Sequence, residues 1–163
     1  MKVYIAGKLG TDSEREILEK LDSLCKSLNF QTFLPHRDVG FAYSIKDVKK
    51  IFEGDIIKGF KDCALVIANL DGLHIGSGTA WELGYAYAKG IPAIGLKTDE
   101  SIEDAFDYLS PILVGSMKIV SSFEELEKEL KLIKEDDLFD LFGKFKTNKT
   151  PQELKNEGRQ GWE

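Results

Sequence analysis

The sequence predicts a doubly wound α/β fold, in which a five-stranded parallel sheet carries helices on both faces. Three observations lead to this prediction. Short apolar runs of strand length alternate with longer amphipathic segments through residues 1–134. The run at residues 64–70 (ALVIANL) has the composition of a strand that is buried on both faces. Glycine-bearing turns follow the first and third runs, at the edge where open α/β sheets bind ligands.

The first half of the chain predicts two strands and two helices. Residues 1–7 form a strand that enters a glycine turn, and Thr11, Asp12 and Ser13 compete to cap the next helix. That helix extends to about Ser27, because apolar residues recur at helical spacing. Residues 30–34 form the second strand, which Pro35 ends. A second amphipathic helix is expected over residues 44–60.

The second half predicts three more strands. Residues 64–70 are the third, and a helix follows from near Thr79 to about Lys89, where Gly90 serves as its C-cap. The fourth strand is expected at residues 91–96 and the fifth at residues 117–120. Residues 111–115 are expected to be irregular, and Ser122 caps a last helix. A flavodoxin-like strand order of 2-1-3-4-5 brings the loops after strands one and three together.

The domain organisation follows from the same pattern. Residues 1–134 are expected to form one α/β domain, and residues 135–163 a C-terminal extension that is partly helical or flexible. The extension is polar overall, but a cluster of apolar side chains predicts that part of it packs on the domain or on another subunit. These side chains are Phe139, Leu141, Phe142 and Phe145.

Composition limits the function. The chain has 163 residues, a net charge of -6 and a sequence pI near 5.1. Clustered basic charge is typical of nucleic-acid-binding proteins, so no nucleic acid is expected as a partner. The sequence shows neither a leader peptide nor an apolar run long enough to span a membrane, so we expect a cytoplasmic protein. Cys25 and Cys63 stand alone, and neither a metal motif nor a cofactor motif is present.

The junction between the third strand and its helix is the candidate site. Gly72, Gly76 and Gly78 turn the chain there, and free backbone N–H groups at a helix start suit a phosphate, a sugar or a carboxylate. Glu82 is expected in the first turn of this helix. A carboxylate in a first turn often does no more than offset the helix dipole, so its position alone does not establish a function.

Residues 70–99 resemble the signature of the nucleoside 2-deoxyribosyltransferase family. The similarity lies in LDG...SGTAWELGYAYAKGIPAIGLKTD, and in VYIAG at residues 3–7, which is similar to the first strand of the family. Asp55, 27 residues before Glu82, stands about where the family has an Asp that contacts the base. The resemblance extends over roughly residues 1–133.

The resemblance implies three catalytic residues. Glu82 corresponds to the nucleophile, Asp55 to the acid or base-contacting group, and Tyr4 to the aromatic residue that orients the nucleophile. Two carboxyl groups at one glycosidic bond divide the work as in retaining glycosidases. From the residues alone, a solvated helix position is the more common explanation for Asp55, and a core residue with a solvent-accessible hydroxyl the more common one for Tyr4.

Further residues are expected to bind substrate. Ala6 and Gly7 allow a ligand close to the backbone, and Trp81 either lines the pocket or packs beneath its helix. Gly76 departs from the family, which usually has an Asp there for the 5′-hydroxyl of the sugar. Ser77 and Gly78 complete a possible anion nest. Asp71 either replaces the missing hydroxyl contact or only forms a turn. Lys8, where the family often has Pro or a small residue, either favours an anionic ligand or, as is more common, is a solvated surface lysine.

The predicted function is therefore a nucleoside 2-deoxyribosyltransferase that moves the sugar to another nucleobase through a deoxyribosyl-Glu82 intermediate. The alternative is hydrolysis of a 2′-deoxynucleoside 5′-monophosphate by the same residues. A further alternative is a non-catalytic nucleotide-binding module, because one fold supports many functions. The partners implied are a nucleoside or nucleotide, a free nucleobase and further copies of the chain, in a homodimer or larger assembly with shared active sites.

Overall fold

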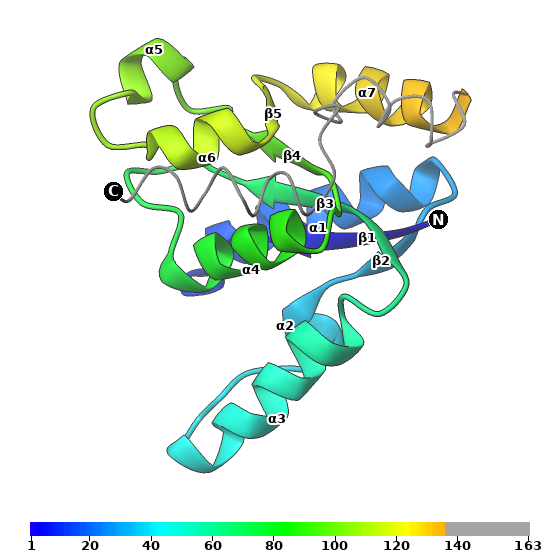
Figure 1. Cartoon of the computed structure of the whole chain (residues 1–163), viewed down its shortest axis with the longest axis vertical. Coiled ribbons are helices and arrows are strands. Elements are labelled where there is room, and N and C mark those ends of the chain that lie inside the picture. Colours follow the sequence, from blue (N-terminus) through cyan, green and yellow to red (C-terminus); the bar gives the residue numbers. More distant parts are fainter. Residues whose placement is uncertain (136–163) are drawn as a thin grey trace, which may run out of the picture. The chain divides into compact units, whose positions relative to one another are not determined.

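The computed structural model describes residues 1–135, and residues Met1–Lys128 form one compact unit. Figure 1 shows the strands and helices in chain order. The elements are β1 (Lys2–Ala6), α1 (Asp12–Ser27), β2 (Gln31–Phe33), α2 (Pro35–Asp38), η1 (Ile45–Asp47), α3 (Val48–Phe52), η2 (Glu53–Lys58), β3 (Cys63–Asn69), α4 (Ser77–Ala88), β4 (Ala93–Leu96), α5 (Ile102–Ala105), α6 (Pro111–Ser116), β5 (Lys118–Val120) and α7 (Phe123–Glu135).

The five strands form one parallel sheet in the order β2-β1-β3-β4-β5. This confirms the predicted fold class and strand order. β1 and β3 are neighbours at the centre, with Tyr4 opposite Val66 and Ala6 opposite Ala68. The loops that follow β1 and β3 consequently leave the sheet side by side, although they are about 65 residues apart in the sequence.

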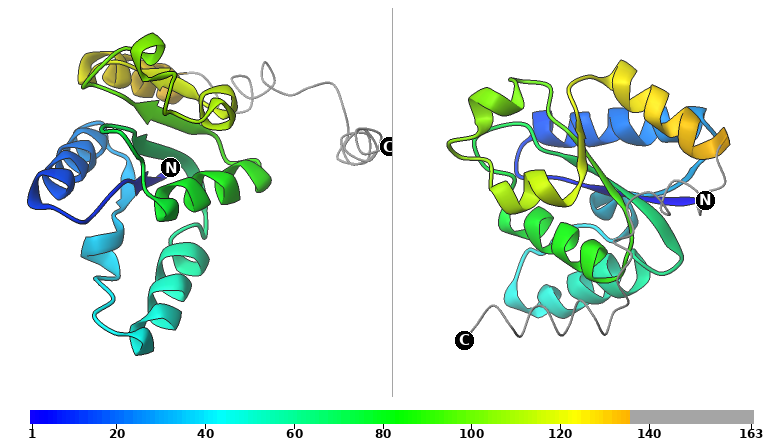
Figure 2. Two further views of the ribbon diagram at one scale, coloured as in Figure 1. Left: turned by 90° about the vertical axis from the view of Figure 1, so that its left-hand side faces the viewer. Right: turned by 45° about the horizontal axis from the view of Figure 1, so that its top comes forward.

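Helices α1 and α4 cover opposite faces of the sheet (Figure 2). Successive residues of a strand point to opposite faces, which assigns Val3 and Ile5 to one face and Tyr4 and Ala6 to the other. All four are fully buried. The cluster on the α4 side contains residues of β1, β3, η2 and α4, so the core there directly supports the elements of the candidate site.

The segment after α2 differs from the prediction. Instead of one amphipathic helix over residues 44–60, it contains the 3-10 turn η1, the short helix α3 and the π-helix η2. The amide of Gly59 donates to the carbonyl of Gly54 at 2.9 Å, which is the i→i+5 bond of a π-turn. Most apolar residues of η1 and α3 are exposed, so the apolar spacing did not indicate a buried face.

One other difference is local. Residues 111–115, expected to be irregular, belong to α6, which has Pro111 at its start, where a fixed φ favours helix and no N–H is needed. The predicted domain boundary at 134 stays a prediction, and the packing expected of Phe139, Leu141, Phe142 and Phe145 lies outside the described residues. Within residues 1–135, no helix combines the length and the apolar character needed to cross a bilayer.

Candidate active site

Helix α4 starts at Ser77 and carries Glu82 beside the end of β1. Its N-cap is Gly76, whose φ of +83° is in the region that favours glycine. Because the helix starts two residues earlier than expected, its first turn holds no acidic residue, and Glu82 lies in the second turn. The prediction of a first-turn position was therefore wrong. Glu82 therefore does not serve mainly to offset the helix dipole, since that effect falls off within the first turn.

Tyr4 and Glu82 are in direct contact. The Tyr4 hydroxyl donates to Glu82 Oε1 at 2.7 Å, across 78 positions of sequence. The Tyr4 ring is fully buried between Phe33 and Phe60, with ring centroids 5.3 and 4.3 Å away. Burial and the nearby Glu82 charge raise the pKa of Tyr4, so its hydroxyl remains a neutral donor. The packing therefore fixes one oxygen of the carboxylate and leaves Oε2 for other contacts.

The Glu82 carboxyl group holds its proton more tightly than an ordinary glutamate. Burial raises the pKa of Glu82 to about 7, the Tyr4 hydrogen bond partly counteracts this, and the Asp55 charge adds to the rise. A carboxylate that titrates near neutral pH because of burial and a neighbouring acid is typical of functional sites. The surroundings of Glu82 therefore disfavour its charged form, unlike those of a carboxylate on the protein surface.

Asp55 belongs to η2 and faces the same region. Burial raises its pKa to about 6, and its Oδ1 atom is buried with no hydrogen-bond partner among the described residues. A buried acceptor without a partner is costly and therefore uncommon in folded proteins. A Cβ on Gly59 would lie 2.1 Å from the Asp55 carbonyl oxygen and 2.7 Å from Tyr4 Cε2, and Tyr4 bonds to Glu82, so the three residues are neighbours. The structure thus brings together the three residues predicted to be catalytic.

Two glycines, Gly54 and Gly59, allow η2 to pack closely enough on its neighbours for Asp55 to lie beside Tyr4 and Glu82. A Cβ on Gly59 would lie 2.7 Å from Tyr4 Cε2 and 2.8 Å from Phe33 Cε1. A Cβ on Gly54 would lie 2.4 Å from Val39 Cγ1. Any larger residue at either position requires the helix to move away from its neighbours. Sequence analysis did not find this role, because helical spacing gives no sign of a π-turn.

The glycine loop before α4 lies against Lys8. Gly72 has a φ of +87°, and a Cβ there would be 2.8 Å from Lys8 Nζ. A Cβ on Gly76 would be 3.3 Å from Lys8 Cγ, whereas a Cβ on Gly78 would meet open space. Lys8 Nζ also pairs with Glu14 Oε1 at 3.2 Å. The two departures from the family pattern, Lys8 and Gly76, are therefore in contact beside the start of α4.

Three of the predicted substrate-binding positions have structural partners. A Cβ on Gly7 would be 2.6 Å from Leu18 Cδ2, so glycine is needed there for α1 to pack, and Ala6 is fully buried. Asp71 accepts hydrogen bonds from the backbone N–H and the hydroxyl of Thr98, at 2.6 and 2.9 Å. Their contact with substrate stays a prediction.

Trp81 lies on the outside of α4 with 49% of its surface exposed. Its ring stacks on Tyr85 at 5.4 Å and meets the edge of Phe52 at 5.9 Å. Tyr85 in turn contacts Phe60, which stacks on Tyr4. A continuous row of aromatic rings therefore connects the buried tyrosine to the surface, and Phe52 and Trp81 bridge α3 and α4 through their side chains.

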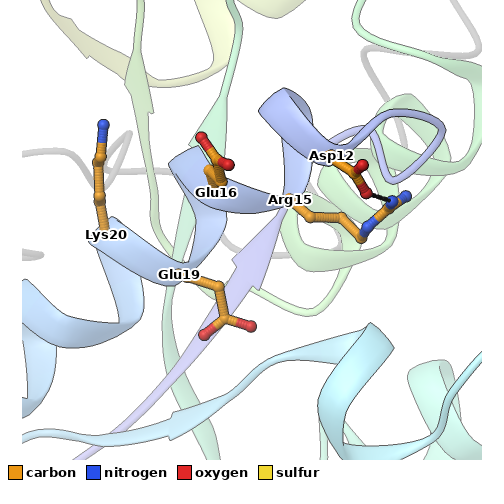
Figure 3. A pocket seen from close by; sticks show the side chains of 5 residues that line it. All are labelled: Asp12, Arg15, Glu16, Glu19 and Lys20. Atoms are coloured by element: carbon orange, nitrogen blue, oxygen red, sulfur yellow. Dashed lines mark hydrogen bonds and ion pairs between the residues drawn. The ribbon is translucent and has the colours of Figure 1, made fainter.

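A hollow of about 410 Å³ follows the outer side of α1, and its charged side chains point in different directions (Figure 3). It contains none of the predicted site residues. Another hollow, of about 300 Å³, lies at the start of α4 between the glycine loop and the segment Tyr108–Leu113, and it includes Gly76 and Ser77. Of these two hollows, the second adjoins the candidate site.

Two carboxyl groups with raised pKa values and a buried tyrosine, at the carboxyl end of a parallel sheet, define a site suited to glycosidic-bond chemistry. The family model described as nucleoside 2-deoxyribosyltransferase matches residues 3–137. The chain therefore belongs to the nucleoside 2-deoxyribosyltransferase family, which identifies it as an N-glycosyl transferase or hydrolase that acts on nucleosides or nucleotides. A comparison with curated protein sequences found no match.

Solved structures with TM-scores above 0.5 share the fold. A conserved protein from Enterococcus faecalis V583 is 28% identical, with a TM-score of 0.66, and the match covers 81% of this chain and 98% of that one. A 2-deoxyribosyltransferase from Bacillus psychrosaccharolyticus is 19% identical, with a TM-score of 0.65 and coverage of 78% and 90%. A CMP N-glycosidase from Clostridium botulinum is also 19% identical, with a TM-score of 0.48 and coverage of 81% and 99%.

Proposed function

We propose that this protein cleaves the N-glycosidic bond of 2′-deoxynucleosides through a covalent deoxyribosyl-Glu82 intermediate and transfers the sugar to another nucleobase. The observation that carries this proposal is the contact between Tyr4 and Glu82. This contact fixes Glu82 Oε1 and leaves Oε2 available for substrate. Burial has also raised the pKa of Glu82 to about 7. Asp55 supplies a second carboxyl group beside it.

The reaction needs two displacements at the anomeric carbon. In the first, Glu82 Oε2 forms a bond to C1′, the C1′–N bond breaks, and its electron pair leaves with the base. Asp55 donates a proton or a hydrogen bond to the departing base. In the second, a ring nitrogen of another base attacks C1′ and passes its proton to Asp55, while the bond from C1′ to Glu82 Oε2 breaks and releases the carboxylate. Tyr4 keeps its proton throughout and holds Oε1 in place.

The two carboxyl groups titrate in neighbouring pH ranges. Burial raises the pKa of Asp55 to about 6, and burial together with the Asp55 charge raises the pKa of Glu82 to about 7, so the pair keeps one proton between these values. Because the pKa of Glu82 is the higher of the two even with the Tyr4 hydrogen bond, Glu82 keeps this proton between pH 6 and 7 and becomes charged as the pH rises above about 7. The attack on C1′ needs this charged form, which the Tyr4 hydrogen bond favours.

A second candidate is hydrolysis of 2′-deoxynucleoside 5′-monophosphates, with water as the acceptor. The observation that favours it is the contact of Lys8 with Gly72 and Gly76. Where the family usually has an acid at position 76, this chain has no side chain and a lysine nearby. Loss of a negative charge and gain of a positive one both reduce repulsion toward a 5′-phosphate, and the start of α4 adds free N–H groups.

The two candidates are separated by mixing the protein with one deoxynucleoside and a different free base. A new deoxynucleoside supports transfer, whereas deoxyribose 5-phosphate formed from a monophosphate supports the hydrolase. A 2′-deoxy-2′-fluoro analogue that reacts slowly should leave a sugar adduct on Glu82, detectable by peptide mass spectrometry. Absence of turnover, together with ligand-induced stabilisation that survives Glu82→Ala, would instead indicate a nucleotide-binding module.

We also expect this chain to work as a homodimer or larger homo-oligomer. Large apolar side chains are exposed on η1 and α3, with Ile45 82% and Phe52 49% exposed. Exposed apolar clusters of this kind favour association. Sedimentation of the purified protein at several concentrations tests this expectation, and a monomer under assay conditions would contradict it.

A further inference from the structure

The loops after β3 and β4 are joined by hydrogen bonds that the proposed chemistry does not use. Asp71, directly after Leu70, accepts from the backbone N–H of Thr98 at 2.6 Å and from its hydroxyl at 2.9 Å. In the opposite direction, the backbone N–H of Gly72 donates to Asp99 Oδ2 at 2.7 Å. Each loop therefore supplies one carboxylate to the backbone of the other.

A buried lysine holds one of these carboxylates. Lys97 is only 1% exposed, and its ammonium group lies 2.5 Å from Asp99 Oδ1 and 3.1 Å from Glu100 Oε1. Its charge also lies 5.6 Å from the centre of the Tyr108 ring. A buried ammonium group is stable only when it is well paired. Asp99 alone among these carboxylates contacts both Lys97 and the glycine loop.

The pKa shifts of Asp99 and Lys97 agree with this arrangement. Burial by itself would raise the pKa of Asp99, but Lys97 and the Gly72 amide outweigh it and hold the pKa below its usual range. Burial would likewise lower the pKa of Lys97, but its two carboxylate partners raise it instead. Both groups therefore remain charged at neutral pH, and the Gly72 amide bonds to an ionised acceptor, which gives a stronger hydrogen bond than a neutral one.

Gly72 connects this network to the proposed substrate site. Its positive φ directs the loop toward Gly76, the N-cap of the helix that carries Glu82. On one side its amide is bonded to Asp99, and on the other its Cα lies against the Lys8 ammonium group. Asp99, in the loop after β4, thus holds the glycine loop in place at Gly72, the residue that lies against Lys8.

We propose that Asp99, held by Lys97, is a positioning residue that sets the glycine loop for binding of the 5′ end of the substrate sugar. This rests on the proposed function, because the resemblance places the 5′ substituent beside position 76. Asp99 touches no reacting atom. Since the 5′ end is bound equally in the ground state and in the transition state, loss of Asp99 should weaken binding more than it slows the chemical steps.

The matched variants are Asp99→Ala and Glu100→Ala. Each removes one carboxylate from Lys97 and leaves it the other, but only Asp99→Ala removes the acceptor of the Gly72 amide. Steady-state kinetics with a deoxynucleoside should show KM raised about tenfold for Asp99→Ala, with kcat changed less than about threefold. For Glu100→Ala, both constants should stay within about twofold of the parent. Asp99→Asn serves as the milder change if Asp99→Ala is poorly folded.

Amide hydrogen exchange gives a readout that does not depend on activity. In the full-length protein, Asp99→Ala should speed exchange of the Gly72 amide at least tenfold, whereas Glu100→Ala should leave it unchanged. Equal effects of the two variants on KM and on exchange would overturn the proposal, because they would reduce Asp99 to a partner of Lys97. If the parent cleaves no nucleoside, the proposed function fails, and the exchange contrast still decides whether Asp99 holds the loop.

Discussion

Glu82 and Asp55 reach the same site on two helices of different construction. Helix α4 is regular, starts at a glycine with positive φ, and is followed by Gly90 in the left-handed region. The segment from Ile45 to Lys58 passes through a 3-10 turn, a short α-helix and a π-helix. One carboxylate is thus placed by local helix geometry, and the other by contacts between distant parts of the chain.

The difference also appears in how the two groups are bonded. Glu82 Oε1 accepts from Tyr4, whereas Asp55 Oδ1 is buried without a partner among the described residues. A bonded carboxylate keeps a fixed orientation, which a nucleophile needs. An acceptor without a partner is poised to bond with something else, as expected for a group that contacts a departing base. The comparison predicts that substitutions in the two helices have different consequences.

The largest effect is expected from Glu82→Gln. This change keeps the shape of the side chain and an acceptor for Tyr4 but removes the proposed nucleophile, so kcat/KM should fall about 10⁴-fold. Release of free base from a deoxynucleoside, followed by chromatography, measures it. Glu16→Gln on the exposed face of α1 is the matched control and should keep full activity. More than a tenth of the parent activity in Glu82→Gln would contradict the assignment.

Asp55→Asn should have the next largest effect, and its size should depend on the leaving group. General acid assistance contributes about 10²- to 10⁴-fold, so kcat/KM for an ordinary purine deoxynucleoside should fall by about that range. An N7-methylated purine leaves without being protonated, and the loss should be much smaller for its deoxynucleoside. Glu53→Gln, exposed in the same helix, is the control. An equal loss with both leaving groups would argue against acid catalysis by Asp55.

Glu82 also links activity to stability. Its pKa is about 7 in the fold, against about 4.5 when unfolded, so the folded state binds more protons between these pH values. Stability therefore falls as pH rises from about 4.5 to about 7, by about 3 kcal/mol from this group. Thermal melts of Glu82→Gln should show it more stable than the parent at pH 8 and equal to it near pH 4. A constant difference across this range would contradict the raised pKa.

The fold could be predicted from sequence because its signals are local, whereas the catalytic roles of the site residues stay a prediction. Apolar runs of strand length gave the five strands, and Tyr4, Asp55 and Glu82 lie in short motifs or at a typical spacing. The turn that holds Glu82 could not be fixed, because the start of α4 depends on the φ of Gly76. The partners of Asp71 and Asp99 lie 27 residues away, and spacing along the chain carries no information about them.

The π-turn could not be predicted for the same reason, because it depends on contacts with residues distant in the sequence. Substitutions at its glycines give the smallest predicted effects. Its i→i+5 bond forms where Gly54 and Gly59 pack against Val39, Tyr4 and Phe33, and these residues come from other elements. Gly84 in α4 provides the contrast, because it is exposed and a Cβ there would meet open space. Alanine should fit easily at Gly84, but at Gly59 it should force η2 away from Tyr4.

Gly59→Ala should therefore lower the free energy of unfolding by about 1 to 3 kcal/mol, as overpacking does, and should reduce kcat/KM through displacement of Asp55. Gly84→Ala should raise the free energy of unfolding by about 1 kcal/mol, since alanine favours the helix over glycine, and should leave activity unchanged. Denaturant unfolding and kinetics on both variants test the contrast. If Gly59→Ala behaved like Gly84→Ala, local helix preference would suffice to place Asp55, and the two helices would not differ in construction.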